Sequence, residues 1–387
     1  MYLNLNEDRL KQQNAFETAR EITQQPSAWL KSVKVIQALK PQLKIFLDIA
    51  AQEGEFDVVF LGAGTSEYVG NVLDLALNPS QNFRLRSVPS TEMVLAPTSY
   101  INQTKHTLFI SFGRSGNSPE SLGAIQAVEA VYSKGHHLFI TCNKDGKLAQ
   151  LVKTMPNAMA VVLPDETNDL GFAMTSSFTS MLLSAYHVLN LDQLDNNAAL
   201  VDVLSANVAS QLNSIASTVQ SIIDTFDFKR LIYLGSHMMR AYTQDSALKI
   251  LELTAGQIPT MYESPMGFRH GPKSFINETA LIVVYLNDDA LIRKYELDLI
   301  AELQRQQKGY KILLVSHKPV DLKSDYAITL LYEAKLPMVL VGLEMMMVAH
   351  CIGFLKSFTM GLTTDNPCPT GEINRVVTGV TLYPVKE

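Results

Sequence analysis

Short apolar runs alternate with longer amphipathic segments along most of the chain. Five runs in the first half are bounded by turn residues: 57–61, 84–88, 106–110, 137–142 and 158–163. Such runs are typical of strands buried in a parallel sheet, and the segments between them have helical periodicity. The alternation restarts in the second half, with apolar runs at 230–234, 279–286, 311–315 and, more weakly, 326–330. The pattern predicts an α/β protein with two parallel sheets, each flanked by helices.

The same pattern predicts how the chain is organised. A helical stretch without Gly or Pro separates the two halves and is predicted to be a connector. The predicted segments are an N-terminal helical segment (1–50), a first domain (51–195), the connector (196–226), a second domain (227–362) and a C-terminal tail (363–387). Within the tail, Val376 to Leu382 is predicted to form a short strand-like run.

One apolar segment has the length of a membrane span. Leu336 to Leu355 is strongly apolar, but it contains Glu344 and His350, which would be costly in lipid. We therefore predict a buried core helix or a helix at a subunit interface.

Composition excludes several classes of protein. With 387 residues, 47% hydrophobic and 18% charged, the chain is expected to form a large core. A net charge of −6 without a basic cluster argues against a nucleic-acid partner. Cys142, Cys351 and Cys368 lack CxxC spacing, so neither a disulfide framework nor a zinc site is predicted, and no metal or cofactor is expected. The N-terminus lacks a signal-peptide pattern, so a cytoplasmic location is expected.

The polar stretch from Ser111 to Ser121 joins a predicted strand to a predicted helix. Ser118 is a natural N-cap for that helix, and Pro119 suits its first turn. The corner leaves backbone N–H groups unpaired at the positive end of a helix dipole, which favours a phosphate over an ordinary capped turn. The residues expected to bind the phosphate are Ser111, Gly113, Arg114, Ser115, Gly116, Asn117 and Ser118.

Neither of the two common nucleotide-binding loops is present. Gly146-Lys147 is followed by Leu148 rather than Ser or Thr, so it is not a P-loop. The turn after the first strand begins like a dinucleotide fingerprint, but Glu67 stands where the third glycine belongs. A small phosphorylated metabolite is therefore the expected ligand. Ligands bind at the carboxyl ends of parallel strands, so further contacts are expected from Gly64, Thr65, Ser66 and Thr175.

Two features of the second half could carry chemistry. Lys249 and Glu252 lie at i and i+3 on a predicted helix and therefore share a face. They form either a surface ion pair or, because their neighbours are apolar, a partly buried carboxylate suited to act as a base. His270 lies in a loop rich in Gly and Pro, where functional histidines often occur, although a lone loop histidine is more often a surface residue.

Four motifs resemble proteins with two sugar isomerase (SIS) domains: Gly-Thr-Ser at 64–66, Ser-Gly-Asn-Ser at 115–118, Ala-Leu-Lys-Ile-Leu-Glu at 247–252 and Arg-His-Gly-Pro at 269–272. Their order and spacing resemble the isomerase half of glucosamine-6-phosphate synthase, which has Gln at position 114 and Thr at 118. Longer stretches at residues 111–121, 171–177, 251–256 and 267–274 are more similar to the bacterial galactosamine-6-phosphate deaminase/isomerase family, also labelled tagatose-6-phosphate ketose/aldose isomerase. The resemblance runs from about residue 20 to the C-terminus.

This resemblance implies a fold, a site and a reaction. The fold is two tandem SIS domains, each a flavodoxin-like three-layer sandwich. Glu252 would transfer the proton and His270 would open the sugar ring, reaching in from the neighbouring subunit of a homodimer, while Lys249 would lie near the sugar. The implied reaction converts an amino-sugar 6-phosphate, most closely D-galactosamine 6-phosphate, to tagatose 6-phosphate and ammonia.

Three alternatives stay open at this point. The first is aldose–ketose isomerisation without deamination, which needs the same two residues. The second is a glucosamine-6-phosphate deaminase, because the sequence does not fix the stereochemistry at C4. The third is a non-catalytic sugar-phosphate sensor, which would need neither Glu252 nor His270. In each case the expected partner is a small phosphorylated sugar rather than a nucleic acid or a membrane.

Overall fold

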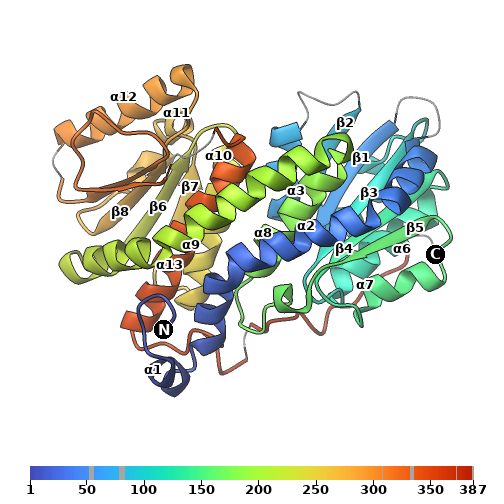
Figure 1. The fold of residues 1–387 in the computed structure, drawn as a ribbon, viewed down its shortest axis with the longest axis horizontal. Coiled ribbons are helices and arrows are strands. Elements are labelled where there is room, and N and C mark those ends of the chain that lie inside the picture. Colours follow the sequence, from blue (N-terminus) through green and yellow to red (C-terminus); the bar gives the residue numbers. More distant parts are fainter. Residues whose placement is uncertain (52–55, 78–82, 307, 332–334, 372, 386–387) are drawn as a thin grey trace. The chain divides into compact units, whose positions relative to one another are not determined.

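The computed structural model describes residues 1–51, 56–77, 83–306, 308–331, 335–371 and 373–385 (Figure 1). The chain forms two compact units. The first-sheet unit comprises residues 27–169, 174–201 and 371–387, and the second-sheet unit comprises residues 1–26, 170–173 and 202–370. Each unit therefore draws on distant parts of the chain, and the linear domain boundaries given above stay a prediction.

The first sheet has five parallel strands in the order β2-β1-β3-β4-β5. Its strands are β1 (Phe56–Gly62), β2 (Arg84–Pro89), β3 (His106–Gly113), β4 (Gly135–Thr141) and β5 (Ala158–Val162). Its helices include α3 (Thr65–Leu77), α4 (Ser90–Leu95), α5 (Pro97–Tyr100), α6 (Pro119–Val131), α7 (Lys147–Gln150) and α8 (Ser176–Val188). Helices α3 and α8 pack together on one face, and α4 and α6 cover the Val59 and Leu61 side. This order is that of the flavodoxin-like fold.

The second sheet repeats this order, as β10-β9-β8-β6-β7, and is also parallel. Its strands are β6 (Arg230–Gly235), β7 (Thr260–Glu263), β8 (Ala280–Tyr285), β9 (Lys311–Ser316) and β10 (Tyr326–Thr329). Helices α11 (Pro265–Phe268) and α12 (Ala290–Gln306) cover one face, and α10 (Met238–Leu253) with α13 (Met338–Thr359) covers the other. The predicted α/β class and the two three-layer arrangements are confirmed.

Long helices account for most of the remaining chain. Helix α1 (Glu7–Gln12) precedes α2 (Phe16–Ala51), which continues through Pro26 and Pro41. Helix α9 (Leu194–Thr225) covers the predicted connector. By contrast, the strand predicted at Val376–Leu382 is wrong, because this segment has no secondary structure and pairs with no strand.

Helix α13 is the apolar segment that resembled a membrane span. Among the described residues it is the one helix long and apolar enough to cross a membrane, and 94% of its apolar window is buried. Gly342 lets it pack directly on Tyr242 of α10, because a Cβ at this position would lie 2.1 Å from the tyrosine ring. Glu344 and His350 are fully buried with it. The prediction of a buried core helix is confirmed.

Candidate active site

The phosphate loop, residues 113–118, joins β3 to α6 at the carboxyl edge of the first sheet. Gly116 has φ +63°, a conformation that glycine adopts without strain. The loop is held from the side by the β4–α7 segment: Asn143 Nδ2 donates to the Ser115 carbonyl (3.0 Å) and Leu148 N to the Gly116 carbonyl (2.9 Å). Thr141 Oγ1 donates to the Gly113 carbonyl (2.6 Å). The carbonyls of the loop are therefore bound on its protein side.

The backbone N–H groups of the same loop differ from its carbonyls in their hydrogen bonding. Within the described part of the chain, the backbone N–H groups of Ser115, Gly116 and Ser118 have no acceptor, and Asn117 N reaches only Ser115 Oγ (3.2 Å). Ser118 is at the N-cap position, as predicted, but its hydroxyl bonds Ser121 Oγ (2.6 Å) instead of capping the helix. The first turn of α6 keeps its free donors, which is the arrangement that binds a phosphate at a helix N-terminus.

Arg114 has a different environment from the rest of the loop. Only 7% of the residue is exposed, and its Nη2 donates to the backbone carbonyl of Arg375 in the C-terminal tail (2.7 Å). Its charge therefore lies beneath the loop, next to the tail. This contact was not predictable from the sequence, because 261 positions separate the two residues.

The other predicted ligand contacts of the first-sheet unit lie at helix starts. Thr65 and Ser66 are buried in the first turn of α3, and Gly64, with φ +56°, is exposed before it. Thr175 is the fully buried N-cap residue of α8. Met174, which precedes it, accepts a weak hydrogen bond from Ser66 Oγ at its sulfur (3.9 Å). The structure thus brings the start of α3 close to the start of α8.

Sequence reasoning missed the residue that fixes the start of α8. Asp169 is fully buried, and its Oδ2 accepts hydrogen bonds from Thr175 N (2.8 Å), Ser177 N (2.8 Å) and Ser177 Oγ (2.6 Å). A carboxylate at a helix N-terminus is favoured by the helix dipole and by the unpaired N–H groups. The signal was present as an acidic residue shortly before a serine-rich helix start.

Helix α10 carries the predicted Lys249–Glu252 pair. Lys249 Nζ lies 2.7 Å from Glu252 Oε2 and 3.5 Å from Asp245 Oδ1. The side chains of Lys249 and Asp245 are fully buried, whereas 21% of the Glu252 side chain is exposed. A buried ammonium thus fixes one oxygen of a carboxylate that stays accessible. The shared face is confirmed, and it is not a surface ion pair.

His350 of α13 belongs to the surroundings of this lysine. Its Nδ1 lies 3.1 Å from Gln25 Nε2 of α2. Burial, together with the positive charge of Lys249, lowers the pKa of His350 to about 3. A histidine that stays neutral leaves the positive charge of the cluster on Lys249. No local pattern in the sequence connects positions 25, 249 and 350.

The loop with His270 is rigid and anchored to α12. Ser264 caps α11 by accepting from Gly267 N (3.0 Å), and Gly271 has φ +115°. Arg269 donates to Asp298 (2.8 Å) and to Glu302 (2.9 Å), and Lys273 also pairs with Glu302. His270 itself is exposed, and within the described residues its ring makes no hydrogen bond or ion pair. A fixed loop therefore presents an imidazole to the surroundings.

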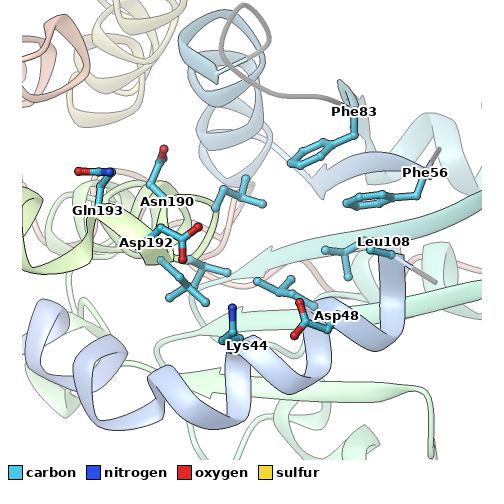
Figure 2. A pocket seen from close by; sticks show the side chains of 13 residues that line it. Lys44, Asp48, Phe56, Phe83, Leu108, Asn190, Asp192 and Gln193 are labelled. Carbon is cyan, nitrogen blue, oxygen red and sulfur yellow. The ribbon is translucent and has the colours of Figure 1, made fainter. Parts of the chain in front are cut away.

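A cavity of about 460 Å³ lies elsewhere in the first-sheet unit (Figure 2). Phe56 and Phe83 form one wall, with ring centroids 4.6 Å apart, and Lys44, Asp48 and Asp192 lie at other sides. Since Phe56 begins β1 and Leu108 lies near the start of β3, this cavity is at the amino edge of the sheet. It is at the opposite edge from the phosphate loop and is not part of that site.

Known proteins are similar to this one over nearly the whole chain. No protein-family model matches it. The D-galactosamine-6-phosphate deaminase AgaS of Escherichia coli O157:H7 is 37% identical over 373 residues, which cover 95% of each chain. The chain belongs to the AgaS family. The earlier resemblance to this family is therefore confirmed.

Solved structures agree with membership of the AgaS family. The tagatose-6-phosphate ketose/aldose isomerase of Escherichia coli is 34% identical, with a TM-score of 0.87 over 96% of this chain and 97% of that one. A protein from Clostridium novyi NT, described as a candidate isomerase of the same kind, is 38% identical, with a TM-score of 0.95 over 99% of both chains. The fold of this AgaS-family protein is thus that of phosphosugar isomerases.

The predicted site residues of this AgaS-family chain fall into two groups. Those of the phosphate loop, with Gly64, Thr65, Ser66 and Thr175, belong to the first-sheet unit. Lys249, Glu252 and His270 belong to the second-sheet unit. In the described ranges, no group of three or more His, Cys, Asp or Glu side chains has the arrangement of a metal site.

Proposed function

We propose that this protein is a deaminating isomerase that converts an amino-sugar 6-phosphate, most closely D-galactosamine 6-phosphate, to tagatose 6-phosphate and ammonia. AgaS relatives from Escherichia coli and Shewanella are named D-galactosamine-6-phosphate deaminase. The structural observation that carries the proposal is the Glu252 carboxylate, held 2.7 Å from a buried Lys249 while part of it stays accessible. Such an ion pair holds the carboxylate in one orientation while it accepts and returns a proton.

The phosphate is proposed to bind to the phosphate loop. The N–H groups of Ser115, Gly116 and Ser118 and the hydroxyls of Ser115 and Ser118 would donate to its oxygens. Such contacts hold the substrate equally in the ground and transition states. They therefore set KM rather than kcat.

His270 is proposed to open the sugar ring. It would move a proton from the O1 hydroxyl to the ring oxygen, giving the open chain with a C1 aldehyde. An exposed histidine with no partner among the described residues is suited to reach a substrate held by a second copy. We therefore propose a homodimer in which His270 acts across the interface.

Glu252 is proposed to carry the chemistry at C1 and C2. The C1 carbonyl acidifies the C2 hydrogen, which Glu252 removes while O1 takes up a proton from solvent, leaving an enolamine. The protonated glutamate then returns the proton to C1, which produces an imine at C2. Water adds to this imine and ammonia leaves, so that one water is consumed for each ketose formed. Because C1 and C2 are adjacent, one carboxylate can serve both, with Lys249 balancing its charge.

A second candidate is aldose–ketose isomerisation of a phosphorylated sugar without nitrogen. The name of the solved Escherichia coli relative favours it. The same ring opening and proton transfer would occur, with a C2 hydroxyl in place of the amine and no release of ammonia. We also propose that the protein acts in the cytoplasm, where phosphorylated sugars are retained.

Ammonia release separates these candidates. The purified protein is supplied with galactosamine, glucosamine, galactose and tagatose 6-phosphates, and both ammonia and ketose are measured. We expect ammonia and ketose in equal amounts, fastest from galactosamine 6-phosphate. Ketose–aldose conversion of tagatose 6-phosphate with no ammonia from either hexosamine would instead support the second candidate. A preference for glucosamine 6-phosphate would change the assigned C4 stereochemistry.

A further inference from the structure

The C-terminal strap, residues 373–385, crosses the first-sheet unit without strand pairing. Most of its residues are exposed, and Arg375, Val376 and Leu382 are the partly buried ones. Leu382 packs on α6 at Gly123, where a Cβ would lie 2.9 Å from the leucine Cδ1. A segment with so few buried side chains is held in place mainly by its anchor points.

Arg375 is the polar anchor of the strap. Its Nε donates to the Asp169 carbonyl (2.8 Å) and its Nη2 to Asn168 Oδ1 (3.0 Å). Its own carbonyl accepts from Arg114 Nη2 (2.7 Å). One residue of the strap thus binds two segments that carry predicted ligand contacts.

These contacts form a continuous path through the first-sheet unit. At one end, Arg114 is the neighbour of Ser115 in the phosphate loop. At the other end, Asp169 fixes the backbone of Thr175 and Ser177 with its carboxylate. Arg375 hydrogen-bonds both Arg114 and Asp169, so displacement of its side chain would loosen both ends.

We propose that Arg375 is a positioning residue for phosphate binding. Arg114 is only 7% exposed, and its guanidinium needs acceptors, because an unsatisfied buried charge is costly. The Arg375 carbonyl supplies one of them only while the Arg375 side chain holds the strap in place. The strap thereby fixes the positive charge beneath the phosphate loop and the backbone of the loop with it. The proposal rests on the proposed function only in taking this loop as the phosphate site.

Inorganic phosphate provides a test that does not depend on the reaction. Its binding is measured by calorimetry, and its inhibition constant against the sugar phosphate is measured where turnover exists. Arg375→Ala should weaken both by roughly tenfold, the effect of losing one or two charge-assisted hydrogen bonds. Arg375→Lys, which keeps a charge but not the fork of donors, should recover part of the loss. Val380→Ala, a substitution at an exposed strap position, is the matched control and should bind phosphate as the wild type does.

A KM-against-kcat comparison excludes a merely structural role. For the 6-phosphate substrate, Arg375→Ala should raise KM and leave kcat nearly unchanged, whereas kcat/KM for the same sugar without phosphate should stay at the wild-type value. In an Arg114→Ala background, Arg375→Ala should have little further effect on phosphate binding. Unchanged phosphate binding in Arg375→Ala, or equal losses for phosphorylated and unphosphorylated sugars, would overturn the proposal.

The proposed reaction and the proposed role of Arg375 can be refuted independently of each other. If the wild type binds inorganic phosphate but releases no ammonia from any hexosamine 6-phosphate, the proposed reaction is wrong and Arg375 can still be tested. If the wild type shows the proposed reaction and Arg375→Ala retains its KM, the reaction stands and the role of Arg375 is wrong.

Discussion

The loops that follow β3 and β8 occupy equivalent places in two sheets of the same strand order, yet their chemistry is opposite. After β3, serines and glycines leave the N–H groups of Ser115, Gly116 and Ser118 without acceptors from any described residue. After β8, the chain supplies its own acceptors: Asp289 Oδ1 binds the N–H groups of Leu291 (2.9 Å) and Ile292 (3.0 Å), and Glu296 binds that of Asn287 (2.8 Å).

The difference teaches that strand order alone does not make a binding site. Both loops start a helix at the carboxyl edge of a parallel sheet, where the backbone favours an anion. In the second loop the side chains of Asn287 and Asp289 accept from backbone N–H groups of the turn, and Asp288 and Asp289 add negative charge. That loop is closed to phosphate, and the predicted chemistry of the second-sheet unit lies on α10 and the loop after α11 instead.

The largest loss of activity is expected from a substitution that removes the proposed base of the second-sheet unit. Glu252→Gln keeps the shape of the side chain but cannot accept a proton, so activity should fall by roughly 10²- to 10⁴-fold. Exchange of the C2 hydrogen with D₂O, followed by proton NMR, should stop together with ammonia release. His270→Asn should slow turnover of the cyclic substrate and spare part of this exchange, because some open-chain sugar forms unaided. Wild-type exchange in Glu252→Gln would show that its pairing with Lys249 is only structural.

A double substitution in the loop after β3 is compared with a single substitution in the loop after β8. Ser115→Ala with Ser118→Ala should raise KM for the 6-phosphate about tenfold or more and change kcat much less, because both hydroxyls bind the phosphate throughout the reaction. Asp289→Ala is the matched control in the equivalent loop. It should lower stability by roughly 0.5–2 kcal/mol through loss of a helix cap and leave KM unchanged. A normal KM in the double variant would contradict the assignment of the phosphate loop.

Substitutions at two glycines of the first-sheet unit distinguish the cost of backbone strain from the cost of steric crowding. Gly116 and Gly64 both have positive φ, +63° and +56°. A Cβ at Gly116 would lie 3.0 Å from Leu148 Cβ and 3.2 Å from Thr141 Oγ1, whereas nothing lies within 4 Å at Gly64. Gly64→Ala should therefore cost about 1–2 kcal/mol of folding free energy from backbone strain alone, and Gly116→Ala more than that. Urea unfolding midpoints of the two variants provide the comparison; equal losses would mean that crowding does not matter.

The smallest expected effect concerns proton binding near the acidic loop. Burial lowers the pKa of His317, but its contacts with Asp288 and with Glu344 (3.1 Å) outweigh burial and raise it to about 9. A pKa above its unfolded value of about 6.5 means that this contribution to stability is complete below pH 6.5 and is lost as pH rises toward 9. Unfolding midpoints measured from pH 6 to 9.5 should fall less steeply for His317→Gln than for the wild type. An identical slope would show that the histidine does not gain its proton on folding.

The sheets were predictable from sequence because their strands are continuous apolar runs. One strand, β7, was missed, since Thr260–Glu263 is only four residues long and only half-buried. Its parallel pairing with β6 defines it, and pairing between distant segments leaves little mark on a short sequence. Helix α2 shows the same limit in the other direction, because tertiary packing carries it through two prolines that locally disfavour a helix.

The site was predictable where neighbouring residues form it. The phosphate loop and the Lys249–Glu252 pair were found because strand–loop–helix order and i, i+3 spacing are local signals. The environment of Arg114 was not, because its acceptor is the carbonyl of Arg375, a tail residue 261 positions away. The role of His350 was missed for the same reason, because Gln25 lies far away in the sequence. Asp169 was missed although its signal was local, since Thr175 and Ser177 follow it closely in the sequence.

The loop between β4 and α7 limits the substitutions that the protein can accept during evolution. Surface loops usually tolerate insertions and substitutions. Here a Cβ on Gly146 would lie 2.4 Å from the Ser115 carbonyl oxygen, and Asn143 binds the same carbonyl. A mutational scan should therefore find these loop positions as intolerant as the interior of the sheet. Lineages that acquire a different ligand must then alter both loops together, which makes this corner slow to change.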